Sequence, residues 1–248
     1  MAKLAILASV KRAFSDTIRA VRAMPILMLA AVIVSGGNAL AEWTFGLSQS
    51  GATLTGKILL AELVLGVAQV ILLAPVQIAI TRLVVLDEVA GGYTLDFKGH
   101  RFQLFCAWSI VLFTLGFVVS ILTRVHGFEG EIGTAVDWSL IIAALGISIG
   151  MALLFPAIAV DAPGATLQNA FADLRGSFWR VVGIFVMTAI PALAVFLAGM
   201  IAIFEIAKID GYEAIGWLLI LSLELLWTAI AARLFLALAN QLRSPANA

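Results

Sequence analysis

The sequence is poor in the residues on which catalytic and metal-binding sites depend. Of its 248 residues, only two are histidine and one is cysteine. The single cysteine, Cys106, cannot form an intrachain disulfide, and a small buried thiol is its expected state. His100 and His126 fall on opposite sides of one apolar segment, so we expect them to share no metal ion. The HExxH and CxxC spacings are also absent. We therefore predict no catalytic residue, no cofactor and no bound metal.

Charge is equally scarce. Charged residues make up 12% of the chain and hydrophobic residues 62%, whereas an average soluble domain carries roughly 25% charged residues. The 15 basic and 15 acidic residues cancel, which argues against nucleic acid as a partner. A soluble core of this size cannot hide so much apolar surface, so the remainder must face lipid. Membrane lipids are therefore expected partners.

Long apolar runs are abundant. A hydrocarbon core of about 30 Å needs about 20 apolar residues of helix. Six stretches reach this length, at 26–46, 57–80, 103–123, 138–160, 181–204 and 214–238. Leu, Ile and Ala dominate, and the alternating polarity of a membrane barrel is missing. The sequence predicts an all-α polytopic bundle with a six-span domain at 25–240 and a short tail at 241–248.

The basic residues are distributed unevenly between the two sides of this bundle. Twelve of the 15 fall on one side: Lys3, Lys11, Arg12, Arg19, Arg22, Arg82, Lys98, Arg101, Arg175, Arg180, Arg233 and Arg243. The other side holds Lys57, Arg124 and Lys208. Because cytoplasmic loops carry the excess of Lys and Arg, both termini are predicted to be cytoplasmic.

Residues 1–24 have the pattern of an interfacial helix. One helical face carries five apolar residues: Leu7, Val10, Phe14, Ile18 and Val21. The basic residues lie mostly on the other side: Lys11, Arg12, Arg19 and Arg22. We expect this helix to lie on the cytoplasmic leaflet at a steep angle to the first span. There each basic residue near anionic lipid contributes about 1 kcal/mol.

A faint internal repeat accompanies the spans. Ala-Phe-Ser-Asp at 13–16 recurs as Ala-Phe-Ala-Asp at 170–173. Leu-Leu-Ala-Pro at 72–75 recurs as Leu-Leu-Phe-Pro at 153–156. The pattern suggests three units of about 80 residues, each an interfacial helix followed by a membrane hairpin. Pro75 and Pro156 lie close to the predicted helix ends, and only Pro191 is central enough to kink a span.

One serine lies in the arrangement of a hydrolase nucleophile. Gly146, Ser148 and Gly150 match G-x-S-x-G, a pattern that needs a strand-to-helix turn and a histidine base. Here it falls within an apolar helix, and neither histidine reaches it. The same residues form G-x-x-x-G, which lets two helices approach closely. Helix packing through Gly146 and Gly150 is the favoured interpretation.

Glu224 is the most informative residue of the sequence. It lies about ten residues into the last span, so roughly 15 Å deep at 1.5 Å per residue. A central carboxylate costs about 2.5–3.5 kcal/mol on insertion scales, so it is a candidate functional residue. The alternative is a protonated or hydrogen-bonded glutamate that holds helices together. Polar residues on other spans at similar depth are Asn38, Gln69, Thr114 and Ser148, and we expect Gln69 or Asn38 to be the partner of Glu224.

Two segments resemble known families. The segment at 75–88, Pro-Val-Gln-Ile-Ala-Ile-Thr-Arg-Leu-Val-Val-Leu-Asp-Glu, resembles a signature of uncharacterised six-span inner-membrane proteins of alphaproteobacteria. The stretch at 153–180, which ends in Phe-Trp-Arg, resembles the membrane domain fused to some glycerophosphodiester phosphodiesterases. The phosphodiesterase catalytic domain has no counterpart in this chain. The resemblance implies a six-helix bacterial inner-membrane protein and names no chemistry.

The function that these patterns favour is non-enzymatic. Because the loops are short, we expect an accessory, assembly or scaffold component of a membrane protein complex, in contact with lipids and with other integral membrane proteins. The alternative is a transporter or lipid-handling protein that uses Glu224. A cavity at the depth of Glu224 would favour the alternative, and a solid bundle with an apolar outer groove would favour the accessory role.

Overall fold

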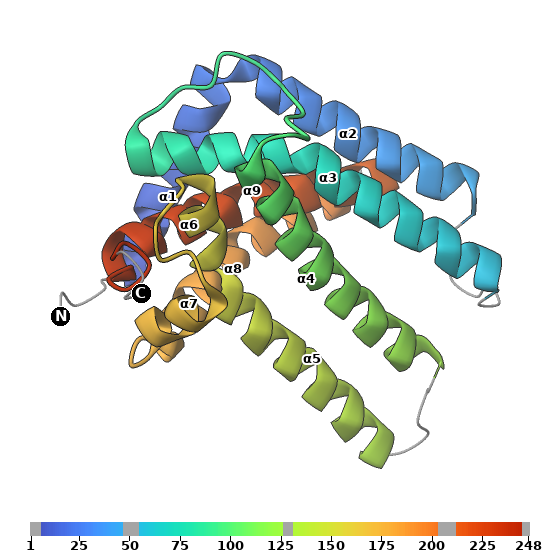
Figure 1. Ribbon diagram of the computed structural model, residues 1–248. Helices are drawn as coiled ribbons and strands as arrows, with labels where there is room; N and C mark the ends of the chain where they lie inside the picture. Colours follow the sequence, from blue (N-terminus) through green and yellow to red (C-terminus); the bar gives the residue numbers. More distant parts are fainter. Residues whose placement is uncertain (1–5, 47–54, 126–130, 203–211, 245–248) are drawn as a thin grey trace.

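The computed structural model describes residues 6–46, 55–125, 131–202 and 212–244, and the described residues contain helices and no strand (Figure 1). The helices have the following bounds: α1 Ile6–Ala23, α2 Pro25–Thr44, α3 Gly56–Leu86, α4 His100–Val125, α5 Glu131–Met151, α6 Leu154–Ala159, α7 Leu167–Leu174, α8 Phe178–Ala202 and α9 Tyr212–Leu238.

Within the described residues, five stretches of helix are long and apolar enough to cross a membrane: Pro25–Thr44, Gly56–Leu86, His100–Thr123, Thr134–Ala159 and Gly216–Leu238. In α8, the stretch Phe178–Pro191 is a shorter apolar helix. The prediction of an all-α polytopic membrane bundle is therefore confirmed. The serine and glycines at 35–37 do not interrupt the first span, because α2 runs through them.

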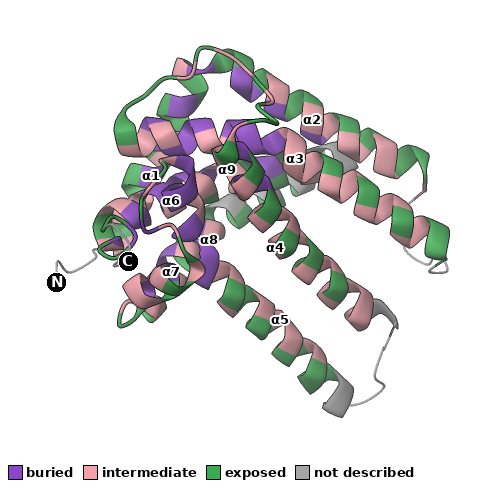
Figure 2. Ribbon diagram, viewed as in Figure 1, coloured by how far each residue is buried: buried purple, intermediate pink, exposed green. Residues whose placement is uncertain are grey.

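Three helical hairpins extend from a common base (Figure 1). The hairpins are α2–α3, α4–α5 and α8–α9. We use the term base for α1, α6, α7, the ends of α3, α4 and α9 that meet them, and residues 239–244. Helix α9 is central, since it packs against α1, α2, α3, α6 and α8. Buried residues concentrate in the base, whereas the far ends of the hairpins are exposed or half-buried (Figure 2).

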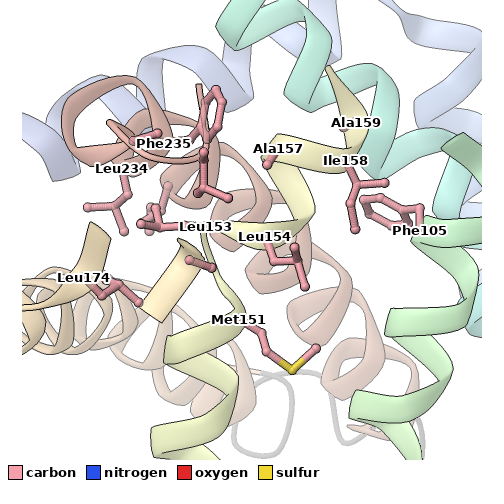
Figure 3. Packing of buried hydrophobic residues seen from close by; sticks show 14 of the residues in the cluster. Phe105, Met151, Leu153, Leu154, Ala157, Ile158, Ala159, Leu174, Leu234 and Phe235 are labelled. Carbon is pink, nitrogen blue, oxygen red and sulfur yellow. The ribbon is translucent and has the colours of Figure 1, made fainter. Parts of the chain in front are cut away.

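Apolar packing in the base joins the α4–α5 hairpin, α6 and α7 to α9 (Figure 3). Phe105 of α4, Leu154 of α6 and Phe235 of α9 belong to one buried cluster, and each is at most 2% exposed. A second cluster joins Leu27 of α2 and Ile80 of α3 to α9. These two clusters hold most of the buried hydrophobic residues of the described chain, so the helices pack most closely there.

The fourth predicted span is not one continuous helix. Helix α5 ends at Met151, and α6 begins at Leu154 after a turn at Ala152 and Leu153. Pro156 has no N–H for the carbonyl of Ala152, and its ring collides with that carbonyl in a regular helix. This proline therefore explains the break. Pro75 has the same local chemistry, yet α3 continues through it.

The end of α9 is held to α1 by an ion pair. The Asp16 carboxylate accepts from Arg233 Nε at 2.5 Å and from Arg233 Nη2 at 2.8 Å. Asp16 is only 6% exposed. The neighbouring Ala13 and Ala20 are fully buried, so small residues on both sides of Asp16 let α1 approach the bundle closely.

A second carboxylate holds the residues that follow α9. The Asp173 carboxylate of α7 accepts from the backbone N–H groups of Asn240, Gln241 and Leu242, each at 3.0 Å. Ala170, which corresponds to Ala13 in the repeat, is also fully buried. The two Ala-Phe-x-Asp segments therefore play matching roles, since each buries an alanine and binds the end of α9.

The middle hairpin departs from the repeat. Residues 87–99, which precede α4, contain no helix, so the expected interfacial helix is missing from this unit. The segment is held instead by Tyr93, whose hydroxyl donates to the carbonyl of Leu72 at 2.7 Å. Burial raises the pKa of the Tyr93 phenol, which keeps this hydroxyl a hydrogen-bond donor.

Arginines close the turns at the ends of α3 and α6. Asp87 and Asp161 have left-handed φ values of 60° and 52°, a conformation that Asp tolerates better than most residues. Asp87 pairs with Arg19 of α1, and Asp161 pairs with Arg101 of α4. Each turn is therefore fixed by a residue from another helix.

We expect Asp16→Ala to lower the free energy of unfolding by about 2–3 kcal/mol, because it leaves the Arg233 guanidinium partly buried without a partner. Arg19→Gln is the matched control. It breaks an exposed pair on the same helix and should cost under about 1 kcal/mol. Unfolding by SDS titration in mixed micelles measures both values. Equal losses in the two variants would contradict a special role for Asp16.

Candidate functional site

Glu224 lies on the central helix and is largely enclosed. Its Oε2 atom is buried and has no hydrogen-bond partner among the described residues. The Glu224 backbone carbonyl accepts from the Thr228 hydroxyl at 2.8 Å, so this polar neighbour is already engaged. Leu221 and Leu225 belong to, or pack against, the cluster that α9 forms with α2 and α3. The structure thus places the carboxyl group among apolar side chains.

The predicted hydrogen bond from Glu224 to Gln69 or Asn38 is wrong. Asn38 donates instead to Glu42, four residues along the same helix, at 2.7 Å. Gln69 is half-buried and makes no side-chain hydrogen bond in the described part of the chain. The other polar residues at this depth, Ser148 and Thr114, do not converge on Glu224 either. Ser148 donates to the carbonyl of Ala144 at 2.8 Å, and Thr114 is exposed.

Sequence reasoning missed Glu42. Its carboxylate is half-buried, accepts from Asn38, and interacts electrostatically with Glu62 of α3. The signal was present in the sequence, because Asn38 and Glu42 are four residues apart and so face each other on a helix. Within the described residues, no group of three or more His, Cys, Asp or Glu side chains has a geometry that would hold a metal ion.

The two glycines of the G-x-x-x-G motif have different surroundings. A side chain at Gly150 would collide with the ring of Phe171 from α7, so Gly150 permits the close contact between α5 and α7. Gly146 has nothing within 4 Å of the position of a side chain. Close packing inside the chain therefore uses Gly150, and Gly146 remains open on the outside of α5. The Ser148 hydroxyl donates its hydrogen bond within its own helix, so the structure gives no support to Ser148 as a nucleophile.

Helix α1 has three faces. Ala13, Asp16 and Ala20 form the face that packs on the bundle. Leu7, Ile18 and Val21 form an exposed apolar face, with Leu7 73% exposed. The third face carries exposed basic residues: Lys11, Arg12, Arg19 and Arg22. Arg19 is paired with Asp87, whereas the other three make no ion pair within the described residues. The helix ends at Ala23 and does not continue straight into α2 (Figure 1).

Two of the cavities formed by the described residues lie at the base, and Glu224 lines neither of these two. A cavity of about 210 Å³ between α1 and α9 is lined by Ser9, Arg12, Arg233, Leu236 and Ala237. A cavity of about 370 Å³ lies on the other side of Leu236. It is bordered by Asp161 and Arg243, which are already bound to Arg101 and to the Phe235 carbonyl.

Comparisons of the chain with profiles of protein families, with characterised proteins and with solved structures found no match.

We expect Glu224→Leu to raise the free energy of unfolding by about 1–2 kcal/mol, because a buried polar group without a hydrogen bond costs roughly 1–3 kcal/mol. Glu42→Leu is the matched control. It removes the partner of Asn38 and should lower stability. Both are measured by SDS titration in mixed micelles. A destabilised Glu224→Leu variant would show that the carboxyl group has a stabilising partner.

Proposed function

We propose that the protein is a non-enzymatic accessory or scaffold component of a membrane protein complex in a bacterial inner membrane. The observation that carries this proposal is the open arrangement of the α4–α5 hairpin. In the most apolar 18 residues of α4, only 11% are buried. Val111 of α4 and Ile142 and Leu145 of α5 are more than half exposed. Much of the surface of this hairpin is therefore available to helices of another protein.

Two glycines on the α4–α5 hairpin support the proposal that its exposed surface contacts helices of another protein as well as lipid. Gly116 of α4 and Gly146 of α5 both have open space where a side chain would lie. Small residues on a lipid-facing helix let a second helix approach closely, and in membranes van der Waals packing is a main source of association. By contrast, Gly66 of α3 is filled by the Phe113 ring of α4. Gly116 and Gly146 therefore stay open, whereas Gly66 is closed from within the chain.

The basic residues support an orientation with the base in the cytoplasm. The parts of the helices that meet at the base (Figure 1) carry most of the basic residues: those of α1, Arg82 of α3, Arg101 of α4, Arg180 of α8 and Arg233 of α9. Cytoplasmic segments carry the excess of Lys and Arg. Both termini are then cytoplasmic, and α1 lies at the inner leaflet with its apolar face in lipid.

One observation favours a second candidate function. The unpartnered Oε2 atom of Glu224 is what a proton-coupled transporter would keep for its substrate or proton. The exchange Glu224→Gln separates the two candidates. A transporter loses proton-coupled flux while remaining folded, whereas an accessory protein keeps its partner and its function.

The partner helix is tested by photo-crosslinking from a probe at Leu145 in cells. We expect one membrane protein to be captured, and Gly116→Leu with Gly146→Leu to reduce this capture at least about tenfold because the bulk separates the helices. Stability should be unchanged, since both positions are open. Gly66→Leu is the control, which should destabilise the fold by collision with Phe113. Crosslinks to lipid alone, or capture unaffected by the double substitution, would refute the proposed interface.

Orientation is tested with single cysteines at Gly51, Gly130 and Asp210, which lie outside the described residues, in a variant that lacks Cys106. A membrane-impermeant thiol reagent should label all three in intact spheroplasts, because the positive-inside rule puts these segments outside the cell. A cysteine at Ser9 should react only after the membrane is opened. Labelling at Ser9 in intact spheroplasts would reverse the topology.

A further inference from the structure

We propose that the cavity between α1 and α9 binds the phosphate of an anionic phospholipid headgroup, one lipid per chain. The cavity has a volume of about 210 Å³ and is partly open to the outside. Its walls come from two helices that are far apart in the sequence, so the site exists only when α1 is packed against α9. This inference is independent of the partner interface on α4–α5.

Three hydrogen-bond donors at the cavity are not used elsewhere in the described structure. Ser9 and Arg12 are three residues apart and therefore share one side of α1. Neither side chain has a hydrogen-bond or ion-pair partner among the described residues. Arg233 uses Nε and Nη2 to bind Asp16, which leaves its Nη1 group free. A hydroxyl and two guanidinium groups are the donors that phosphate oxygens accept most strongly.

The charge of the cavity fits a phosphodiester. Arg12 and Arg233 each carry one positive charge, and Asp16 cancels one of them. The three side chains together therefore carry a net charge of about +1, which matches the single negative charge of a phosphodiester. Because Asp16 fixes Arg233 in place, the guanidinium is already oriented, and less side-chain freedom is lost when a ligand binds.

The remaining surroundings favour a lipid over a free anion. Leu236 and Ala237 form the apolar part of the wall. Ile6 lies against Gly183 of α8, one helical turn from Trp179, which is 80% exposed. Exposed tryptophans mark the membrane–water interface, which is the depth of lipid phosphates.

The test measures lipid retained by the full chain in native mass spectrometry, after reconstitution with phosphatidylglycerol or phosphatidylcholine. We expect the wild type to retain one phosphatidylglycerol. Arg12→Gln should weaken its affinity about tenfold or more, the effect of one charge-assisted hydrogen bond. Arg22→Gln is the matched control, because Arg22 is exposed on the same helix and does not line the cavity. It should change the affinity less than about twofold.

Arg12→Lys keeps the charge and should retain more lipid than Arg12→Gln. If Arg12→Gln and Arg22→Gln lose equal affinity for phosphatidylglycerol, the lipid is held by a diffuse electrostatic attraction and the proposed site is refuted. If phosphatidylcholine is retained as well as phosphatidylglycerol, the cavity does not recognise the anionic headgroup. A further experiment measures whether inorganic phosphate or glycerol phosphate displaces the bound lipid. If millimolar concentrations of either displace the lipid completely, a free phosphate is the ligand and the lipid assignment is overturned.

Discussion

The arrangement of the whole chain depends on how the end of α9 is held by two carboxylates. Helix α9 touches five other helices, so its position sets theirs. Asp16 binds the Arg233 side chain, and Asp173 binds the backbone beyond the helix. A buried carboxylate is costly without partners, but each of these two receives at least two donors. Hydrogen bonds are directional, and each of these carboxylates accepts at least two of them. Together they fix the rotation of α9 about its axis and its position along that axis. Apolar packing alone constrains these two motions less.

The sequence predicts the helices well because membrane insertion depends on local composition. Apolar runs of about 20 residues identify the spans without knowledge of their neighbours. The break in the fourth span is different. Pro75 and Pro156 follow the same Leu-Leu-x-Pro pattern, yet only Pro156 interrupts its helix. Local sequence gives both prolines the same preference, and the packing around each decides whether the helix bends, breaks or continues. The missing helix before α4 is likewise a departure that the repeat could not predict.

The candidate site was less predictable, because the depth of a residue in the membrane does not determine which way its side chain points around the helix. Asn38 and Gln69 were matched to Glu224 by their distance along the span, but each residue advances about 100° around a helix. Two residues at one depth can therefore face opposite ways. Asn38 instead uses Glu42, a partner that the local i, i+4 spacing supplies at little entropic cost. Asp16 shows the reverse case. Its partner is 217 residues away, and only the repeated Ala-Phe-x-Asp pattern hinted that it was more than a polar residue on an amphipathic helix.

The contrast between a well-packed base and open hairpins follows from the solvent that each part meets. The hydrophobic effect drives apolar side chains together in water, but lipid tails are as apolar as leucine, so spans gain little from closing against one another. The ion pairs of Arg19, Arg101 and Arg233 and the short helices α6 and α7 lie at the base, where burial and ion pairs both stabilise the fold. Little of α4 is buried within the described chain, and Phe113 of α4 fills the space beside Gly66 of α3. A hairpin that is fixed at one end and free at the other can adjust to a partner helix without any cost to the base, which is the physical property that an accessory membrane protein requires.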